Sequence, residues 1–192
     1  MGFTSVTNAA YSLPLVKQFV AIVQRDMQAA LDAVAIANGG VGGQYPSFNE
    51  YNFATLPVIA PPELTIVARS VTVDVEASQQ FETRSGIEIS CVLIVAETDR
   101  NRLAEGVQNY ARALSWVIET AGNNLGADQS SFYIPLPLKM EHLGQVTTVP
   151  LANQTVLYFR MVGQEFGPLL VSATDSYLQA ASVKVVSILS EI

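Results

Sequence analysis

Residues 87–96 read Ile-Glu-Ile-Ser-Cys-Val-Leu-Ile-Val-Ala, and this stretch decides the fold. Every second residue from Ile87 to Val95 is apolar, which is the period of a strand with one face in a core. From Val92 onward the intervening positions are apolar as well. We therefore predict a central strand that is covered on both faces.

A second alternating run lies just upstream of this strand. Val71, Val73 and Val75 alternate with polar residues, which again predicts a strand. The segment between the two runs, 78–86, is polar and short, so we expect an antiparallel hairpin with a protruding tip. The tip would carry Glu82 and Arg84.

Two segments have the periodicity of amphipathic helices. In Leu13–Ala37 apolar residues recur every three or four positions, with Ser12 as the expected N-cap, Pro14 in the first turn and Gly39-Gly40 as the stop. The second helix is predicted to follow the cap residues Thr98-Asp99 and to end at Gly122. Its Trp116 falls near the margin of the apolar face, where it is either a contact residue or part of the core.

Two stretches rich in glycine and proline interrupt these elements. Segment 39–63 contains Tyr45, Phe48, Tyr51 and Phe53, and an aromatic content this high is unusual for disorder. It is interpreted as an arm that contacts another chain, with a loop folded back on its own domain as the alternative.

The C-terminal third of the chain is predicted to be irregular at first and then β-rich. Segment 123–150 carries several prolines and glycines and is expected to be irregular. Segment 155–162 predicts a strand that ends before Gly163 and a Gly167-Pro168 turn. For 178–190 both strand and helix fit, and the density of Ser, Val and Ile favours strand. The whole predicts a single α+β domain over 1–192, with an antiparallel or mixed sheet packed by two long helices and with irregular arms at 39–63 and 123–150.

Charged residues make up only 14% of the chain, against about 25% in ordinary soluble domains. Such a deficit indicates either a membrane or surface hidden against other subunits. A membrane span needs about 18 to 20 consecutive apolar residues, and the longest clean run is the six residues 91–96. The first twelve residues lack the pattern of a secretory leader, so we expect synthesis and assembly in the cytosol without a membrane.

Few residues are suited to catalysis or metal binding. His142 is the one histidine and Cys91 the one cysteine, and Cys91 lies in the apolar run, where a buried inert thiol is expected. The glycines of 39–43 follow a helix and lack the lysine of a phosphate loop. We therefore expect no catalytic residues, no metal and no cofactor.

The basic residues do not predict a nucleic-acid site. The chain has 10 Lys and Arg against 17 Asp and Glu, a formal net charge of −7, and the arginines are scattered. Gripping phosphates requires clustered positive charge. An acidic wall would still let DNA pass without binding it.

The order of elements resembles the tail terminator, or tail-completion, proteins of tailed bacteriophages. The features that carry the resemblance are the long N-terminal helix, the proline-bounded entry Leu-Pro-Val-Ile-Ala-Pro-Pro-Glu-Leu, the hairpin with Phe-Glu-Thr-Arg-Ser-Gly at its tip, the central strand leading to an acidic cap, a second helix and β-rich C-terminal segments. The chain departs from smaller family members in segments 39–63 and 123–150.

The resemblance implies a structural virion protein rather than an enzyme. Such proteins form rings, typically hexamers, that cap the tail tube, stop its polymerisation and join the tail to a head-tail connector or stopper protein. DNA passes through the ring, and the protein resides in the virion at the neck of the tail. No cofactor is implied.

We expect aromatic and hairpin-tip residues to make the contacts with neighbouring subunits and partners, because aromatics are enriched at interface centres. They are Tyr45, Phe48, Tyr51, Phe53, Glu82, Arg84, Phe132 and Tyr133. Two alternatives to the terminator remain, namely another neck or tail ring component (a connector, stopper or tube-like protein) and an oligomeric cytosolic α+β enzyme or ligand-binding subunit.

Overall fold

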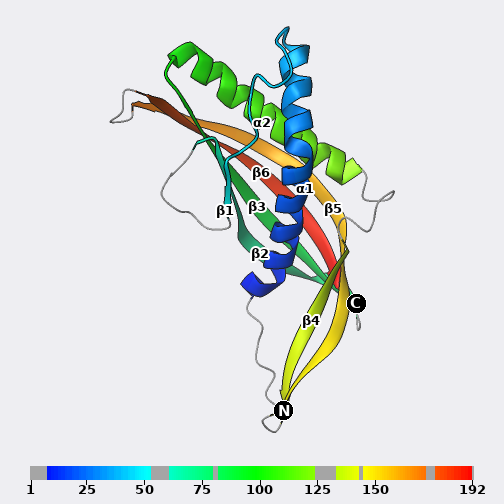
Figure 1. The fold of residues 1–192 in the computed structure, drawn as a ribbon. Coiled ribbons are helices and arrows are strands. Elements are labelled where there is room, and N and C mark those ends of the chain that lie inside the picture. Colours follow the sequence, from blue (N-terminus) through cyan, green and yellow to red (C-terminus); the bar gives the residue numbers. More distant parts are fainter. Residues whose placement is uncertain are drawn as a thin grey trace.

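The computed structural model describes residues 8–52, 61–79, 82–123, 133–142, 145–171 and 176–191, with side chains in 15–51, 61–74, 84–123, 156–171 and 176–190. These residues form two helices and six strands (Figure 1). In chain order they are α1 (Asn8–Ala37), β1 (Glu50–Asn52), β2 (Glu63–Gln79), β3 (Glu82–Glu97), α2 (Arg100–Asn123), β4 (Tyr133–His142), β5 (Gln145–Val171) and β6 (Tyr177–Glu191).

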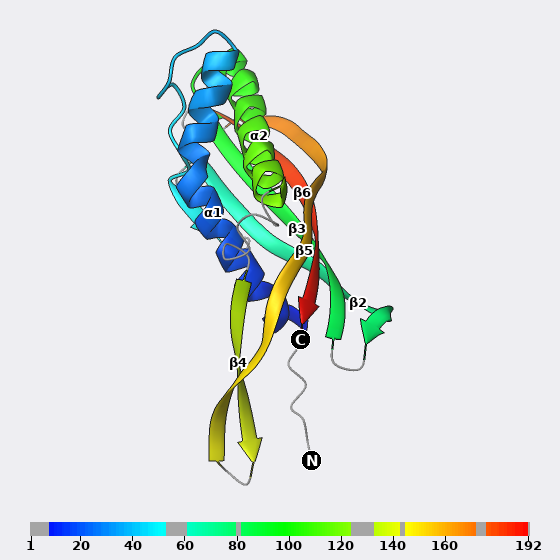
Figure 2. The same cartoon turned by 90° about the vertical axis from the view of Figure 1, so that its right-hand side faces the viewer.

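The strands form one sheet in the order β1-β2-β3-β6-β5-β4. The short β1 pairs parallel to β2, and all other neighbours are antiparallel. Both helices lie on the same face of the sheet, α1 over β2 and α2 over β3, β5 and β6 (Figure 2). The predicted α+β class with a mixed sheet and two packing helices is confirmed.

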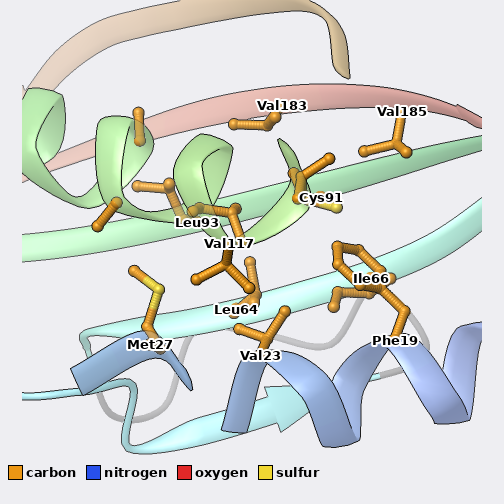
Figure 3. Close-up of a cluster of buried hydrophobic side chains, with 14 of the residues drawn as sticks. Phe19, Val23, Met27, Leu64, Ile66, Cys91, Leu93, Val117, Val183 and Val185 are labelled. Atoms are coloured by element: carbon orange, nitrogen blue, oxygen red, sulfur yellow. The ribbon is translucent and has the colours of Figure 1, made fainter. Parts of the chain in front are cut away.

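The core lies between the helices and the sheet. The alternating residues of β3 from Ile87 to Val95 are buried, and they meet Phe19, Val23 and Met27 of α1 and Val117 of α2 across the layer (Figure 3). β3 lies between β2 and β6, so its predicted central position is confirmed.

The opposite face of the sheet differs from the prediction for β3. Val92 and Ile94 stay partly exposed, and no helix or strand in the described ranges covers them (Figure 2). The apolar residues on this second face are therefore not explained by packing against the chain's own described helices.

The first helix begins earlier than predicted and ends where predicted. α1 begins at Asn8, so Ser12 and Pro14 lie inside the helix and the N-cap prediction is wrong. A proline inside a helix removes one backbone bond and need not end the helix. At the other end, Gly39 has φ 82°, its N–H donates to the carbonyl of Ile36 (3.0 Å), and the Gly40 N–H donates to the carbonyl of Ala35 (2.9 Å). This is a Schellman cap.

The predicted hairpin exists but is longer than expected. β2 and β3 pair antiparallel from Glu63↔Ile94 to Gln79↔Glu82. Glu82 closes the ladder opposite Gln79 at the tip end of the hairpin and Arg84 pairs with Asp74, so both are strand residues near the tip and not the turn residues that were predicted. Strands that extend past the helices face no core there, so their polar residues resemble a turn in sequence.

The described part of segment 123–150 is regular, since 133–142 and 145–150 are strand, which corrects the prediction of an irregular arm there. β4 and the beginning of β5 pair from Tyr133↔Thr155 to His142↔Gln145 and form a two-stranded ribbon that projects from the sheet (Figures 1 and 2). Pro135 and Pro137 are two residues apart, so their missing N–H groups lie on the same side of the edge strand. Prolines are tolerated in strands at such edges.

β5 also continues where a turn was predicted. Gly163 and the Gly167-Pro168 pair lie within it, and the register with β6 shifts between Met161 and Gly163 and between Phe166 and Leu169. These residues mark β-bulges, which glycine accommodates without ending a strand. The predicted strand over 178–190 is confirmed as β6.

The predicted α2 and its cap are confirmed. Asp99 Oδ1 accepts the N–H groups of Asn101 (2.7 Å) and Arg102 (3.0 Å), as expected of an N-cap. In the part of the chain that the structure describes, neither helix combines the length and apolar character needed to cross a membrane.

Candidate functional site

The aromatic segment after α1 packs on its own subunit. Phe48 is only 6% exposed and belongs to the core cluster, and its ring lies 5.3 Å from that of Tyr110 on α2. Tyr45 packs edge-on against Tyr110 at 6.0 Å, and Tyr51 against Phe48 at 5.8 Å. The interpretation of this segment as an arm against another chain is therefore wrong for Phe48, because a buried ring offers no area to a partner.

Hydrogen bonds hold the same segment in place. Gln28 of α1 accepts the Ser47 N–H (2.9 Å) and donates to the Tyr45 carbonyl (3.1 Å). The Tyr110 hydroxyl donates to the Pro46 carbonyl (2.5 Å), and burial raises the pKa of Tyr110 well above its usual range. Tyr45 and Tyr51 are half-buried at the rim of this cluster.

The other predicted contact residues are dispersed. Phe53 and Phe132 lie outside the described residues. Tyr133 begins β4 opposite Thr155, and Glu82 begins β3 opposite Gln79. Arg84 pairs with Asp74 in the β2–β3 ladder and is partly buried. The predicted set thus does not converge on one site, and a role for its members in partner contacts stays a prediction.

The described residues contain no group of three or more His, Cys, Asp or Glu side chains placed to hold a metal. Cys91 is fully buried, and that burial raises the pKa of its thiol far above the usual range, so the predicted inert thiol is confirmed. The ion pairs Arg160–Glu119 (2.9 Å) and Lys184–Glu165 (2.5 Å) are partly exposed surface pairs.

Exposed apolar side chains gather on β5, which the sequence analysis did not single out. Six of the eleven large apolar residues that are strongly exposed in the described ranges belong to this strand, with Val162 57% and Val171 69% exposed. The six are Leu157, Tyr158, Val162, Phe166, Leu170 and Val171. Adjacent apolar pairs such as Leu157-Tyr158 and Leu170-Val171 could have indicated this exposed apolar surface in the sequence. A strand with one buried face needs an apolar residue only at every second position.

The outer side of β5 also lacks a strand partner over much of its length. β4 pairs with β5 only as far as Thr155, and within the described ranges no strand pairs with the outer side of Val156–Val171. We call this side the open β5 edge. Unpaired strand edges present rows of N–H and C=O groups to solvent and tend to pair with other chains.

Helix α2 lies directly beside this edge. Glu119 Oε1 accepts the Met161 N–H (3.4 Å), and Gln164 hydrogen-bonds Ser115 on the same helix. The open β5 edge and its six exposed apolar residues form the candidate interaction surface. Trp116, which follows Ser115 on α2, is a further exposed aromatic residue (51%).

Comparisons with known proteins do not assign the chain to a family. No protein-family model and no curated protein sequence matches it. Among solved structures, it is similar to a chain of the virion of a native gene transfer agent particle, with a TM-score of 0.42 and 11% sequence identity over 97% of this chain and 99% of that one. We draw no functional conclusion from a likeness of this degree.

Proposed function

We propose that this chain is a structural subunit of a phage-like virion, and more specifically a ring-forming tail terminator that caps the tail tube and joins it to the head connector. The observation that carries the proposal is the open β5 edge with its six exposed apolar residues. Surface of this kind on a charge-poor chain is expected to be covered by other protein chains.

Three further features support the same function. The projecting β4–β5 ribbon gives the subunit a second contact element away from its body (Figures 1 and 2). Isolated two-stranded ribbons are marginally stable in water, so contact with a neighbour would stabilise it. The net charge of −7 suits a channel wall that lets DNA pass. The element order resembles that of tail terminators.

The test has two stages. Light scattering and negative-stain microscopy of the purified chain should show rings of about six subunits, the number typical of tail terminators, because a head-to-tail contact that closes generates a ring. Adding these rings to growing tubes of the cognate tail-tube protein should stop elongation at one end. Rings that bind connector but not tube ends would indicate another neck component. A monomer that binds a small metabolite would contradict the proposal.

A further inference from the structure

We propose that the open β5 edge pairs with the outer edge of β2 in a second copy of this chain, so that one sheet continues from subunit to subunit. This inference rests on the proposed ring function and names the surfaces that build the ring. The β2 edge is defined here as the outer side of Ile66–Asp74. Within the described ranges β1 pairs with β2 only at residues 63–65, so the β2 edge has no strand partner.

The two edges are complementary in direction. β2 is antiparallel to β3, β3 to β6, and β6 to β5, so β5 runs opposite to β2. Rotation about an axis that runs along the strands keeps each strand's direction. In a ring built this way, β5 of one copy meets β2 of the next in the antiparallel orientation, which is the more stable pairing. A contact between two different edges is heterologous, and such contacts form a ring when the rotation from copy to copy closes.

Both edges also carry exposed apolar side chains. The β2 edge carries the exposed Val73, and the open β5 edge carries Val162 and Phe166. Pairing would bury these apolar side chains and satisfy unpaired backbone groups at the same time.

Helix α2 limits which part of β5 is free to pair. Glu119 binds both the Met161 N–H (3.4 Å) and Arg160 (2.9 Å), so it covers the edge at that point. After Met161, Glu119 no longer covers the edge, and Gln164 bonds Ser115 and the Ala111 carbonyl (3.4 Å) of α2 through its side chain rather than through the β5 backbone. We therefore assign the contact mainly to this second half of β5.

The decisive experiment places one lysine on each edge. Val73→Lys blocks the β2 edge and Val162→Lys blocks the open β5 edge, because a charge facing an apolar neighbour cannot be buried cheaply. Each variant is expected to raise the concentration at which half of the chains are assembled by at least about tenfold. Ile36→Lys is the matched control, since Ile36 is more exposed (62%) than Val73 (44%) and Val162 (57%) and lies at the end of α1 rather than on a sheet edge.

Mixing the two variants distinguishes the arrangement. Each keeps one intact edge, so an equimolar mixture should form dimers of one Val73→Lys and one Val162→Lys chain and nothing larger. If only Val162→Lys disrupts assembly, the contact joins β5 to β5 and the proposal fails. Rings that withstand both substitutions overturn this inference but leave the proposed function standing, whereas a wild-type chain that stays monomeric overturns both.

Hydrogen exchange gives a second readout that needs no variant. Assembly of the wild-type chain should slow amide exchange in 66–74 and 162–171, compared with the diluted monomer. Unchanged exchange in both segments would contradict the pairing even if the lysine variants failed to fold.

Discussion

Gly122 shows how closely α2 approaches the sheet. A Cβ atom at this position would collide with the backbone carbonyl oxygen of Phe159 on β5, and a backbone atom cannot rotate away. We expect Gly122→Ala to lower the free energy of unfolding by about 2 kcal/mol, as overpacking of a core does. Urea unfolding followed by circular dichroism measures the change.

Gly163 provides the matched control for this substitution. It lies on the same strand as Phe159, and a Cβ there would meet nothing within 4 Å. Gly163→Ala should therefore leave the unfolding midpoint unchanged or raise it slightly. Equal losses in both alanine variants would show that the collision at Gly122 is not the cause.

The buried hydroxyl of Ser187 is expected to destabilise the fold. The side chain of Ser187 is fully buried on β6, and its hydroxyl finds no hydrogen-bond partner among the residues that the structure describes. Replacing it by alanine removes an unsatisfied group at little loss of packing, so we expect the free energy of unfolding to rise by about 1 kcal/mol.

Ser115 offers the contrasting case to Ser187. Its hydroxyl donates to the Ala111 carbonyl (2.7 Å) and also bonds Gln164 of β5. Ser115→Ala should lower stability by about 1 kcal/mol, because the Gln164 amide loses a partner. Chemical denaturation of the two alanine variants should thus give shifts of opposite sign, and a loss for Ser187→Ala would contradict the assignment.

At the scale of the elements, the cap of α2 predicts a pH dependence. The backbone N–H groups of Arg102 and Asn101 lower the pKa of Asp99. Since the folded pKa lies below the unfolded value of about 3.9, the stabilisation is fully present above that value and is lost as the pH falls through the folded pKa. Asp99→Ala should therefore lower the melting temperature at neutral pH, and the difference from wild type should shrink in acid.

Asp99→Asn removes the charge of the Asp99 side chain but keeps an oxygen that can cap α2. Asparagine is also a good N-cap, so this variant should retain most of the helix stability. The melting temperature of this variant should stay close to that of the wild type between about pH 6 and about pH 2. The remaining difference is the contribution of the Asp99 carboxylate charge, which asparagine lacks. Thermal melts by circular dichroism across this range check both variants, and a pH-independent loss for Asp99→Ala would refute the linkage.

The segment after α1 is held by one side chain in particular. Gln28 binds both the Ser47 N–H and the Tyr45 carbonyl, so Gln28→Ala should speed amide exchange of Ser47 by about tenfold or more, while the helices change little. Gln24→Ala, an exposed position one turn earlier on α1, is the control. Unchanged exchange at Ser47 would mean that Phe48 and Tyr110 alone hold the segment.

The strands and α2 show how far a local sequence pattern predicts secondary structure. The alternation around β3 and the three- to four-residue spacing of α2 report one buried face each. α2 was predicted nearly to both ends and β3 to its C-terminal end, whereas the start of β3 at Glu82 was predicted to be a turn. β4 and both ends of β5 were missed because prolines and glycines predict turns locally, whereas edge strands and bulges tolerate them. Whether such a segment forms a turn or a strand depends on its strand partner, which is distant in sequence.

The candidate surface was missed for a related reason. The aromatics after α1 predicted a contact with another chain, yet Phe48 and its neighbours found a partner in Tyr110, some sixty residues away. Exposure depends on which faces the fold covers, and that is not a local property. The exposed apolar residues of β5 become evident only when the sheet order leaves that edge unpaired.

For the whole molecule, the charge deficit and the open edges have one explanation. A sheet with both helices on one face leaves its other face and both edges for neighbours, and few charges are needed where neighbours cover the surface. The ring would then be the unit that completes the sheet. The forces holding it should be apolar burial and backbone hydrogen bonds rather than ion pairs.

This balance of forces predicts how the assembly responds to salt. The ion pair Lys184–Glu165 near the open edge is exposed, and such pairs contribute little and are screened by salt. Rings should therefore persist from about 0.05 M to about 1 M sodium chloride, and sulfate should strengthen them because it favours apolar burial. Sedimentation velocity at each salt concentration measures the fraction assembled. Dissociation at high salt would show instead that ion pairs hold the subunits together, and the apolar edge of β5 would then lose its central place in the assembly.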